Sequence, residues 1–414
     1  MNKLYIFPLW IFLSCFLLSN YLTFGQEPIW VWAKSPTGVN DDAYECTIST
    51  DLQGNVYVGG CFYSLTVTFG SFTLTSPANG NEHLFLVKYD PSGNVLWASG
   101  AVCTYSNGIT SLAMDAAGNI YIAGYYDSDI TFGSFTLQNA GSHDVFLVKY
   151  DPNGNVIWAG RAGGNDCDAA ESVAVGASGD IYITGFFASS SITFGSVTLT
   201  NTEDGYDIFI AKYDANGNVT WAKSGGGIYD DYGRGVDTDP SGNVYITGEF
   251  HSMTMTIGPY TLTNQNVTPG FDRSDMFIAK YDANGNVLWA KSAGGNQSET
   301  VNSLSVDTAG NVFLPGNYFG DTITLGSSTF TNMNPQSTNI FLAKYSTDGD
   351  ILWAVGAGGP NDDGITSVST DNHGNVYLAR YSDSPSITFG SYTLPNPDSW
   401  LSNLFVTSVK LNIK

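Results

Sequence analysis

The chain has few charged residues, and positive charge is especially scarce. Only 13% of its 414 residues are charged, and 15 lysines and arginines face 38 aspartates and glutamates, which gives a net charge of −23. Such a surface repels the phosphates of nucleic acids and of anionic lipids, and it favours cations or basic partners. The low charge does not indicate disorder, because hydrophobic residues make up 43% of the chain and aromatic residues 14%. We therefore expect a packed protein that does not bind nucleic acid.

Sequence motifs of catalysis and of metal binding are also missing. The four histidines lack the spacing of metal ligands, and there is no HExxH, paired CxxC, nucleophile elbow or phosphate loop. Residues 237–242 begin like a calcium loop, but the position that needs a bidentate glutamate holds Gly248. No motif therefore assigns a catalytic residue or a metal ligand.

The one long hydrophobic run lies at the start of the sequence. Lys3 is followed by apolar residues, and Thr23 and Gly25 offer the small side chains that a signal peptidase needs. This pattern predicts a secretory signal peptide over residues 1–25 and a mature domain over residues 26–414. An uncleaved membrane anchor is the alternative, because residues 4–25 nearly reach the length of a bilayer span. With cleavage, we expect a monomer without a transmembrane segment, exported to the periplasm, the outer surface or the medium.

Cysteine is scarce as well. Four cysteines follow the predicted signal peptide: Cys46, Cys61, Cys103 and Cys167. In an oxidising compartment they could form two disulfides, with three possible connectivities. Cys46 and Cys61 flank one predicted hairpin, yet the expected register places them diagonally rather than opposite. A Cys46–Cys61 disulfide and free thiols remain alternatives.

What the chain does have is an internal repeat. Tryptophan recurs at spacings of 65, 61, 63, 68 and 64 residues, at Trp32, Trp97, Trp158, Trp221, Trp289 and Trp353. Between tryptophans three features keep their order: an apolar hairpin such as SLAMDAAGNIYIAG, an insert such as ITFGSFTL, and a hairpin such as FLVKYDPSGNVLWA that ends in the tryptophan. Alternation of period two, with β-branched and aromatic residues, predicts strands throughout.

The turns between these strands have specific chemistry. In the first hairpin an aspartate precedes a glycine by three residues, as at Asp51 and Gly54, and repeat three replaces this aspartate with Gly176. We expect the aspartate to accept backbone N–H bonds and the glycine to take a positive φ. In the insert, glycine followed by serine or proline predicts a two-residue turn with glycine first.

These features predict an all-β fold, a six-bladed β-propeller with four main strands per blade plus a small protruding hairpin. Radial closure hides the sheet edges that would otherwise aggregate. Residues 30–35 match the end of a repeat, whereas the last repeat supplies three strands and no tryptophan strand. We therefore expect residues 30–35 to pair beside residues 405–411 and to complete blade six. We also expect the tryptophans to be core residues between blades.

The repeat resembles the SBBP family of β-propeller repeats, which are common in exported proteins of Bacteroidetes. The matching segments are those typified by FLVKYDPSGNVLWA and DAAGNIYI, and they cover essentially the whole mature chain. The resemblance implies a propeller in the envelope or outside the cell of a Gram-negative bacterium, and it implies no catalytic residues. The family name implies seven blades, whereas this sequence contains six repeats.

Acidic residues recur in the loops that lead from each tryptophan strand to the next inner strand. Aligned on the turn glycine, one position reads Ala43, Asn107, Asp168, Asp231, Glu299 and Asp363, and Asp42, Asp166, Asp230 and Asp362 lie beside it. In a propeller these loops meet at one face, so we expect an acidic, cation-attracting surface there. Calcium is the expected ion, because it accepts oxygen ligands in loose geometry.

Strand capping and solubility are the alternative explanation of these carboxylates. We favour that explanation for a second polar ring at the start of each third strand, which comprises His83, Asp144, Asp207, Asp275, Asn339 and Asn403. For the first ring the two explanations remain equally open.

The repeat breaks its own pattern at a few positions. One inner-strand position reads Cys46, Thr110, Glu171, Arg234, Asn302 and Thr366, so Glu171 and Arg234 are a candidate ion pair between adjacent blades. Arg380 replaces a glycine found in the other five repeats. We treat these three residues as candidate ligand-binding residues, with structural pairing favoured over catalysis.

Two functions remain open. The first is a non-catalytic binding or scaffold propeller that displays its acidic face and hairpins to a protein, a glycan or a cation. The alternative is a carboxylate-based glycan hydrolase or lyase, because propellers host enzymes as well as binding proteins. Regular repeats with few unique residues favour the first, whereas a close carboxylate pair with one strongly raised pKa would favour the second.

Overall fold

The structure is a computed structural model that describes residues 32–38, 42–76, 82–102, 106–265, 273–370, 375–396 and 403–410. The chain divides into two units, Met1–Lys34 and Ser35–Lys414, and the strands lie in the second. Every regular element in the described part is a strand, as the sequence predicted. No helix in that part is long and apolar enough to cross a membrane.

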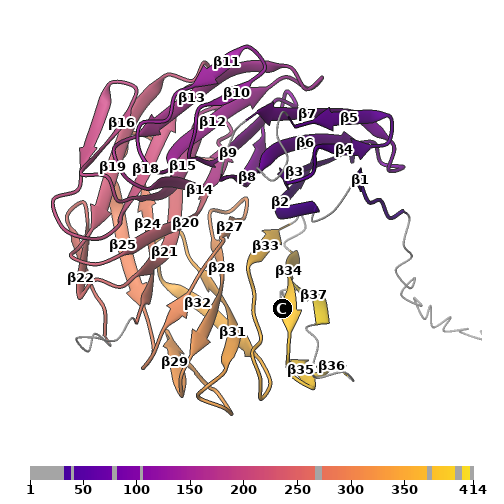
Figure 1. Cartoon of the computed structure of the whole chain (residues 1–414). Coiled ribbons are helices and arrows are strands. Elements are labelled where there is room, and N and C mark those ends of the chain that lie inside the picture. The colour runs from indigo at the N-terminus through magenta and orange to yellow at the C-terminus, as the bar shows by residue number, and fades with distance from the viewer. Residues whose placement is uncertain are drawn as a thin grey trace, which may run out of the picture. The chain divides into compact units, whose positions relative to one another are not determined.

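Each repeat builds one antiparallel sheet, with its strands in chain order (Figure 1). Repeat 1 contains β2 (Asp42–Thr50), β3 (Val56–Phe62), β6 (His83–Tyr89) and β7 (Val95–Val102), and repeat 2 contains β8 (Asn107–Met114), β9 (Ile120–Tyr126), β12 (Asp144–Tyr150) and β13 (Val156–Gly163). Repeat 3 contains β14 (Asp168–Val175), β15 (Ile181–Phe187), β18 (Asp207–Tyr213) and β19 (Val219–Gly226). Repeat 4 contains β20 (Asp231–Thr238), β21 (Val244–Phe250), β24 (Asp275–Tyr281) and β25 (Val287–Ala293). In repeat 5 the inner strand is broken into β26 (Glu299–Thr300) and β27 (Ser305–Val306), followed by β28 (Val312–Phe319), β31 (Thr338–Tyr345) and β32 (Ile351–Ala357). Repeat 6 contains β33 (Ser367–Thr370), β34 (Asn375–Ser382) and β37 (Asn403–Lys410).

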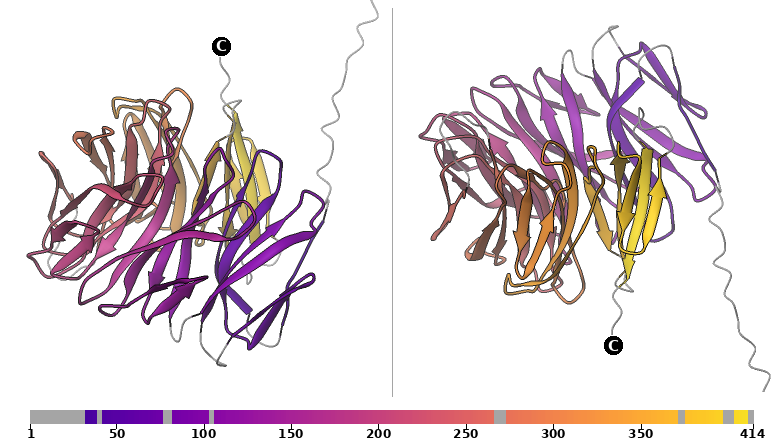
Figure 2. Two further views of the ribbon diagram at one scale, coloured as in Figure 1. Left: turned by 90° about the horizontal axis from the view of Figure 1, so that it is seen from above. Right: turned by 90° about the horizontal axis from the view of Figure 1, so that it is seen from below.

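Neighbouring sheets lie side by side in chain order (Figures 1 and 2). The inner strands of successive repeats are in contact, from β2 with β8 to β27 with β33. The third strands β6, β12 and β24 are buried along their whole length. Neighbouring sheets cover both faces of β12 and β24, whereas β6 packs on the sheet of repeat 2 with one face and on residues of its own small hairpin, Val67 and Phe69, with the other. The core is accordingly a series of clusters between sheets: Leu84 and Leu86 of repeat 1, for example, pack with Ile120 and Ile122 of repeat 2.

The aspartate turns form as predicted. In repeat 1 the Asp51 carboxylate accepts the backbone N–H of Gln53 at 3.0 Å and that of Asn55 at 2.8 Å. Gly54 has a φ of 79° and donates its N–H to the Asp51 carbonyl. A residue with a Cβ atom rarely adopts this left-handed conformation, so the glycine is required by the backbone. In repeat 3, where the aspartate is missing, the Gly176 N–H still closes the turn on the Asp180 carbonyl.

The small hairpins do not protrude freely, contrary to expectation. They are β4 (Thr66–Phe69) with β5 (Phe72–Thr75), β10 (Ile130–Phe132) with β11 (Phe135–Leu137), β16 (Ser191–Phe194) with β17 (Val197–Thr200), β22 (Thr254–Ile257) with β23 (Tyr260–Thr263), β29 (Thr322–Leu325) with β30 (Ser328–Thr331), and β35 (Ser386–Phe389) with β36 (Tyr392–Pro395). The hairpins of repeats 2, 3 and 4 pair with the tryptophan strand of the preceding repeat, which extends those sheets to six strands. This pairing covers part of an outer edge that would otherwise be open to other chains.

Trp97, Trp158, Trp221, Trp289 and Trp353 pack against the core clusters, as predicted, but each is only partly buried. The indole N–H groups of Trp97, Trp158, Trp221 and Trp289 donate to turn carbonyls of the next repeat at 3.0–3.3 Å. Their rings lie against the positive-φ glycines of those same turns: Gly154, Gly217, Gly285 and Gly349. Each ring fills the space that a missing Cβ leaves, while its outer edge stays in solvent.

The predicted closure of repeat 6 is not confirmed. Among the described residues β37 pairs with β34 alone, and residues 32–36 form no strand. A short strand β1 (Thr37–Gly38) pairs with β4, so that Thr37 lies opposite Thr68. Val102 takes the same place opposite Thr131 in the next repeat. Thr37 therefore stands where the end of a tryptophan strand stands elsewhere, five residues after its tryptophan.

The cysteine register agrees with the prediction. Tyr44 lies opposite Cys61, and Cys46 falls in an irregularity between Tyr44 and Thr47, so the two cysteines are not directly opposite. Cys103 lies outside the described residues.

Candidate functional site

The predicted acidic ring lies inside the protein. Asp168, Asp231, Glu299 and Asp363 each have 0% of their surface exposed. The carboxylate of Asp168 accepts hydrogen bonds from the N–H of Gly164 at 2.7 Å and from the hydroxyl of Ser189 at 2.8 Å. It thereby ties the loop before β14 to the loop after β15.

Two other repeats have the same arrangement. Asp231 accepts the hydroxyl of Ser252 at 2.9 Å. Asp363 accepts the N–H of Gly359 at 2.6 Å and the hydroxyl of Ser384 at 2.9 Å. A ligand does not reach carboxylates enclosed in this way, so the expectation of a solvent-facing ring is corrected at these positions. Capping of the loops, the alternative explanation, accounts for them.

Burial also changes the acidity of these groups. It raises the pKa of Asp168 to about 6, that of Asp231 to about 7 and that of Glu299 to about 9. A smaller contribution comes from the second polar ring, because each carboxyl has a neighbour 24 residues earlier in the preceding repeat. These neighbours are Asp144 for Asp168, Asp207 for Asp231 and Asp275 for Glu299. A carboxyl pair thus lies at three successive junctions between repeats, and all its members are buried except Asp207, which is half-buried.

The adjacent acidic residues lie nearer the surface and cap neighbouring strands. Asp230 accepts the N–H of Tyr206 at 3.1 Å, and Asp362 accepts that of Thr338 at 2.8 Å. Asp166 is exposed and accepts the N–H of Cys167. The structure describes the backbone of Asp42 in β2 and of Arg380 in β34, whereas the side chains of both lie outside the described part.

The calcium prediction finds no support in this geometry. The residues that the structure describes contain no group of three or more His, Cys, Asp or Glu side chains placed to hold a metal ion. The physical reason is that Asp168, Asp231 and Asp363 are turned into their own loops, where backbone N–H and serine hydroxyl groups satisfy them.

The predicted ion pair between repeats 3 and 4 is present. The guanidinium of Arg234 lies 3.2 Å from the Glu171 carboxylate and 2.8 Å from that of Glu249. Its carbon also lies 4.4 Å from the centre of the Tyr232 ring. Glu249 was not predicted from the sequence, although it follows the repeat glycine Gly248 at a position where the other repeats have a different residue type.

Three aromatic side chains gather beside this ion pair. Phe186 and Tyr206 are stacked at 5.1 Å, and Tyr232 lies edge-on to them at 5.1 and 5.5 Å. We call Phe186, Tyr206 and Tyr232 the Tyr206 cluster. The matching positions at the other described junctions do not hold three aromatic residues: they are Cys61, Glu82 and Gly108; Tyr125, His143 and Ala169; Glu249, Ser274 and Thr300; Asn317, Thr338 and Gly364. The cluster is therefore a break in the repeat, and it was not predicted from the sequence.

A second set of residues missed from the sequence holds the repeats together. In repeats 1 to 5 the lysine that precedes the tyrosine of the third strand is buried, at Lys88, Lys149, Lys212, Lys280 and Lys344. Lys212 contacts the Asp180 carboxylate of its own repeat at 3.0 Å and donates to the Ala283 carbonyl of the next repeat at 3.2 Å. The recurrence of this lysine could have predicted its structural role from the sequence, because a strand lysine that faces solvent has no reason to recur.

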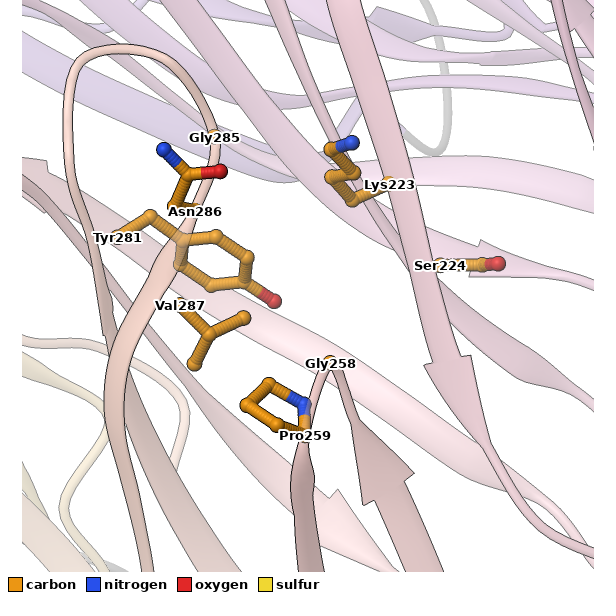
Figure 3. A pocket seen from close by; sticks show the side chains of 8 residues that line it. All are labelled: Lys223, Ser224, Gly258, Pro259, Tyr281, Gly285, Asn286 and Val287. Carbon is orange, nitrogen blue, oxygen red and sulfur yellow. The ribbon is translucent and has the colours of Figure 1, made fainter.

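The structure also contains shallow pockets at contacts between repeats. One has a volume of about 340 Å³, and Lys223, Pro259, Tyr281 and Val287 are among the residues that line it (Figure 3). A second pocket, of about 410 Å³, lies between the Asp51 and Asp115 turns. A third, of about 350 Å³, lies beside β30. Each lies where a turn or hairpin of one repeat meets another strand. Apart from Pro259, the first pocket is lined by residues of the kind that other repeats share, since Lys223 has its counterpart in Lys291.

Comparison with known proteins supports repeats of the propeller type. No protein-family model matches the chain. The chain is 24% identical over 435 residues to an uncharacterized WD repeat-containing protein, L264, of Acanthamoeba polyphaga mimivirus, over 83% of this chain and 30% of that protein. It is 27% identical over 190 residues to the regulatory protein FlaEY of Caulobacter vibrioides, over 45% of this chain and 18% of that protein. The chain thus spans less than a third of the length of either relative.

A solved structure is also similar. It is the crystal structure of a protein of unknown function from Bacteroides caccae, with a TM-score of 0.36 and 10% identity, over 72% of this chain and 79% of that one.

Proposed function

We propose that this chain is a non-catalytic binding or scaffold propeller. The observation that carries the proposal is the division of its polar side chains. The repeated carboxylates and lysines are buried in loop caps and in contacts between repeats, whereas the half-exposed polar and aromatic side chains around Arg234 break the repeat. Function resides in a site on a scaffold rather than in the fold itself, and this irregular patch on regular sheets is such a site.

The glycan-active enzyme is the weaker candidate. Asp168 and Asp231 do have raised pKa values of about 6 and about 7, a property of catalytic acids. Both carboxyls are fully buried and hydrogen-bonded to their own loops, so a sugar would not contact them. Burial in a structural role is sufficient to explain the raised values.

We further propose that the six repeats close into a ring, with residues 30–35 as the fourth strand of repeat 6. The pairing of Thr37 with Thr68 supports this, because it repeats the register in which Val102 pairs with Thr131. Cysteines introduced at residue 33 and in β37 should then form a disulfide under mild oxidation, and an open arrangement should give none.

Export through a signal peptide at residues 1–25, in an SBBP-type envelope protein, belongs to the same proposal. Its support is the hydrophobic run after Lys3 and the repeat motif. Expression in a Gram-negative host, followed by N-terminal sequencing of the periplasmic protein, tests it. An uncleaved chain in the membrane fraction would contradict it.

The binding function is tested with the mature chain immobilised and offered a glycan panel and a panel of acidic, neutral and basic peptides. We expect saturable binding to one class, and no release of reducing sugar or unsaturated product from any glycan. Turnover of a glycan would overturn the proposal in favour of the enzyme.

A further inference from the structure

The Tyr206 cluster is held rigidly at the junction of repeats 3 and 4. The N–H of Tyr206 donates to the Asp230 carboxylate at 3.1 Å, and the Tyr206 carbonyl accepts the N–H of Asp231 at 2.7 Å. Gly205, with a φ of 128°, lies so close to the backbone of Tyr229 that a Cβ there would come within 2.7 Å of it. The loops of both repeats therefore fix the aromatic rings before any partner arrives, which reduces the entropy cost of binding.

The cluster is accessible and its polar ends are free. Phe186, Tyr206 and Tyr232 are each partly exposed, and Tyr229 beside them is 48% exposed. Within the described residues, no protein atom hydrogen-bonds to the hydroxyl of Tyr206 or Tyr232. Most other aromatic residues in the part of the chain that the structure describes are buried, so a partly exposed group of three is unusual there.

The charge around the cluster is negative. Asp166, Glu171, Asp230 and Glu249 lie around it, and both glutamates pair with the guanidinium of Arg234. The whole chain adds to this field with its net charge of −23. An aromatic face in a negative field attracts a cation by two routes, through the ring quadrupole and through the carboxylates. Arg234 already uses this geometry inside the protein, 4.4 Å from the Tyr232 ring.

We propose that the Tyr206 cluster, with Asp166 and Asp230 at its rim, binds the arginine or lysine side chains of a basic protein segment. The proposal deepens the binding function proposed above and rests on it, because it names the partner's chemistry and the surface that recognises it. Planar guanidinium groups stack on aromatic rings and donate paired hydrogen bonds to carboxylates, so arginine is expected to bind more tightly than lysine.

The test measures binding of the mature chain to four labelled peptides of one design, an alternation of glycine and serine with arginine, lysine, glutamine or glutamate. We expect the affinity to fall in that order and to weaken with added salt. Tyr206→Ala should weaken arginine-peptide binding about tenfold, whereas Tyr206→Phe should retain most of it, because a ring is sufficient. Asp166→Asn with Asp230→Asn should also weaken it about tenfold, since asparagine keeps the acceptor for the Tyr206 N–H but not the charge.

Two matched controls separate this site from a general effect of acidic surface. Asp348→Asn with Asp350→Asn removes the same charge from an exposed turn of repeat 5, and Tyr392→Ala removes a 75% exposed aromatic ring from repeat 6. Both control variants should bind the arginine peptide with an affinity within about twofold of that of the wild type. Equal loss in the control and test variants would reduce the binding to non-specific charge attraction and overturn the proposal.

A second result would also overturn the proposal of a basic partner. In it, a neutral oligosaccharide binds the wild type but not Tyr206→Ala, and none of the peptides binds. The binding function itself would survive that result. Absence of any ligand in the wider panels, together with turnover of a glycan, would instead count against the binding function.

Discussion

The indole ring of Trp221 in repeat 3 lies directly over Gly285 in repeat 4. A Cβ atom at residue 285 would lie 2.8 Å from the ring, and the indole N–H donates to the Ala283 carbonyl at 3.1 Å. The same contact joins repeats 1 and 2, 2 and 3, and 4 and 5. It explains why tryptophan and the turn glycine recur together in the sequence, since each occupies the space that the other leaves.

Substitutions at this contact should be strongly coupled. Trp221→Ala should lower the free energy of unfolding by about 2 kcal/mol, less than the roughly 3–5 kcal/mol of a fully buried tryptophan, because the ring is partly exposed. Gly285→Ala should cost about 1–3 kcal/mol, since it meets both the ring and a φ of 80°. In the double variant the clash is gone, so its loss of unfolding free energy should be smaller than the sum of the losses in the two single variants. Urea unfolding of all four proteins measures the coupling, and strict additivity would show that the contact is not formed.

What the sequence predicted correctly depends on local chemistry. The Asp51 turn, the two-residue hairpins and the period-two strands follow from a few adjacent residues, and the repeat multiplies each signal. The Glu171–Arg234 pair could also be predicted, because aligned repeats place equivalent residues side by side. The wrong predictions concern which strands pair between repeats and which side chains are covered by a distant loop. The sequence could not indicate that β10 pairs with β7 of the preceding repeat, or that Ser189 encloses Asp168, since both depend on the approach of distant loops.

The ion pair at Arg234 should contribute to stability through its two carboxylates. In Arg234→Met, Glu171 and Glu249 would face each other without a cation, and the Glu249 side chain is only 8% exposed. We expect unfolding at neutral pH to become easier by about 2–3 kcal/mol, because the variant leaves buried charge unpaired. The triple variant that adds Glu171→Gln and Glu249→Gln should recover most of the loss. If it recovered nothing, the arginine would act by packing on Tyr232 rather than by charge.

The buried lysines should matter for stability, and an exposed lysine provides the control. Lys212→Met removes the contacts with Asp180 and the Ala283 carbonyl, and we expect a loss of about 1–3 kcal/mol. Lys223→Met makes the same chemical change eleven residues away on an exposed position, and it should leave the thermal midpoint nearly unchanged. A similar shift in both variants would indicate a general effect of net charge.

The buried carboxyls make stability depend on pH in a defined direction. Burial raises the pKa of Glu299 to about 9, against roughly 4 in an unfolded chain. Between these values the folded protein holds a proton that the unfolded chain has lost. By linkage, the free energy of unfolding therefore falls as pH rises through this window, and above pH 9 Glu299 adds no further slope. Asp231, with a pKa of about 7, contributes in the same direction up to that pH.

Glu299→Gln replaces the protonated carboxyl by a neutral group of similar shape and removes this slope. We expect the variant to unfold at higher urea concentration than the wild type at pH 8.5 and at a similar concentration at pH 5. Asp350→Asn, at an exposed position, should follow the wild type at both values. Parallel curves for Glu299→Gln and the wild type across the range would mean that Glu299 is ionised in the folded protein. The junction between repeats 4 and 5 would then have to hold a charge that its burial disfavours.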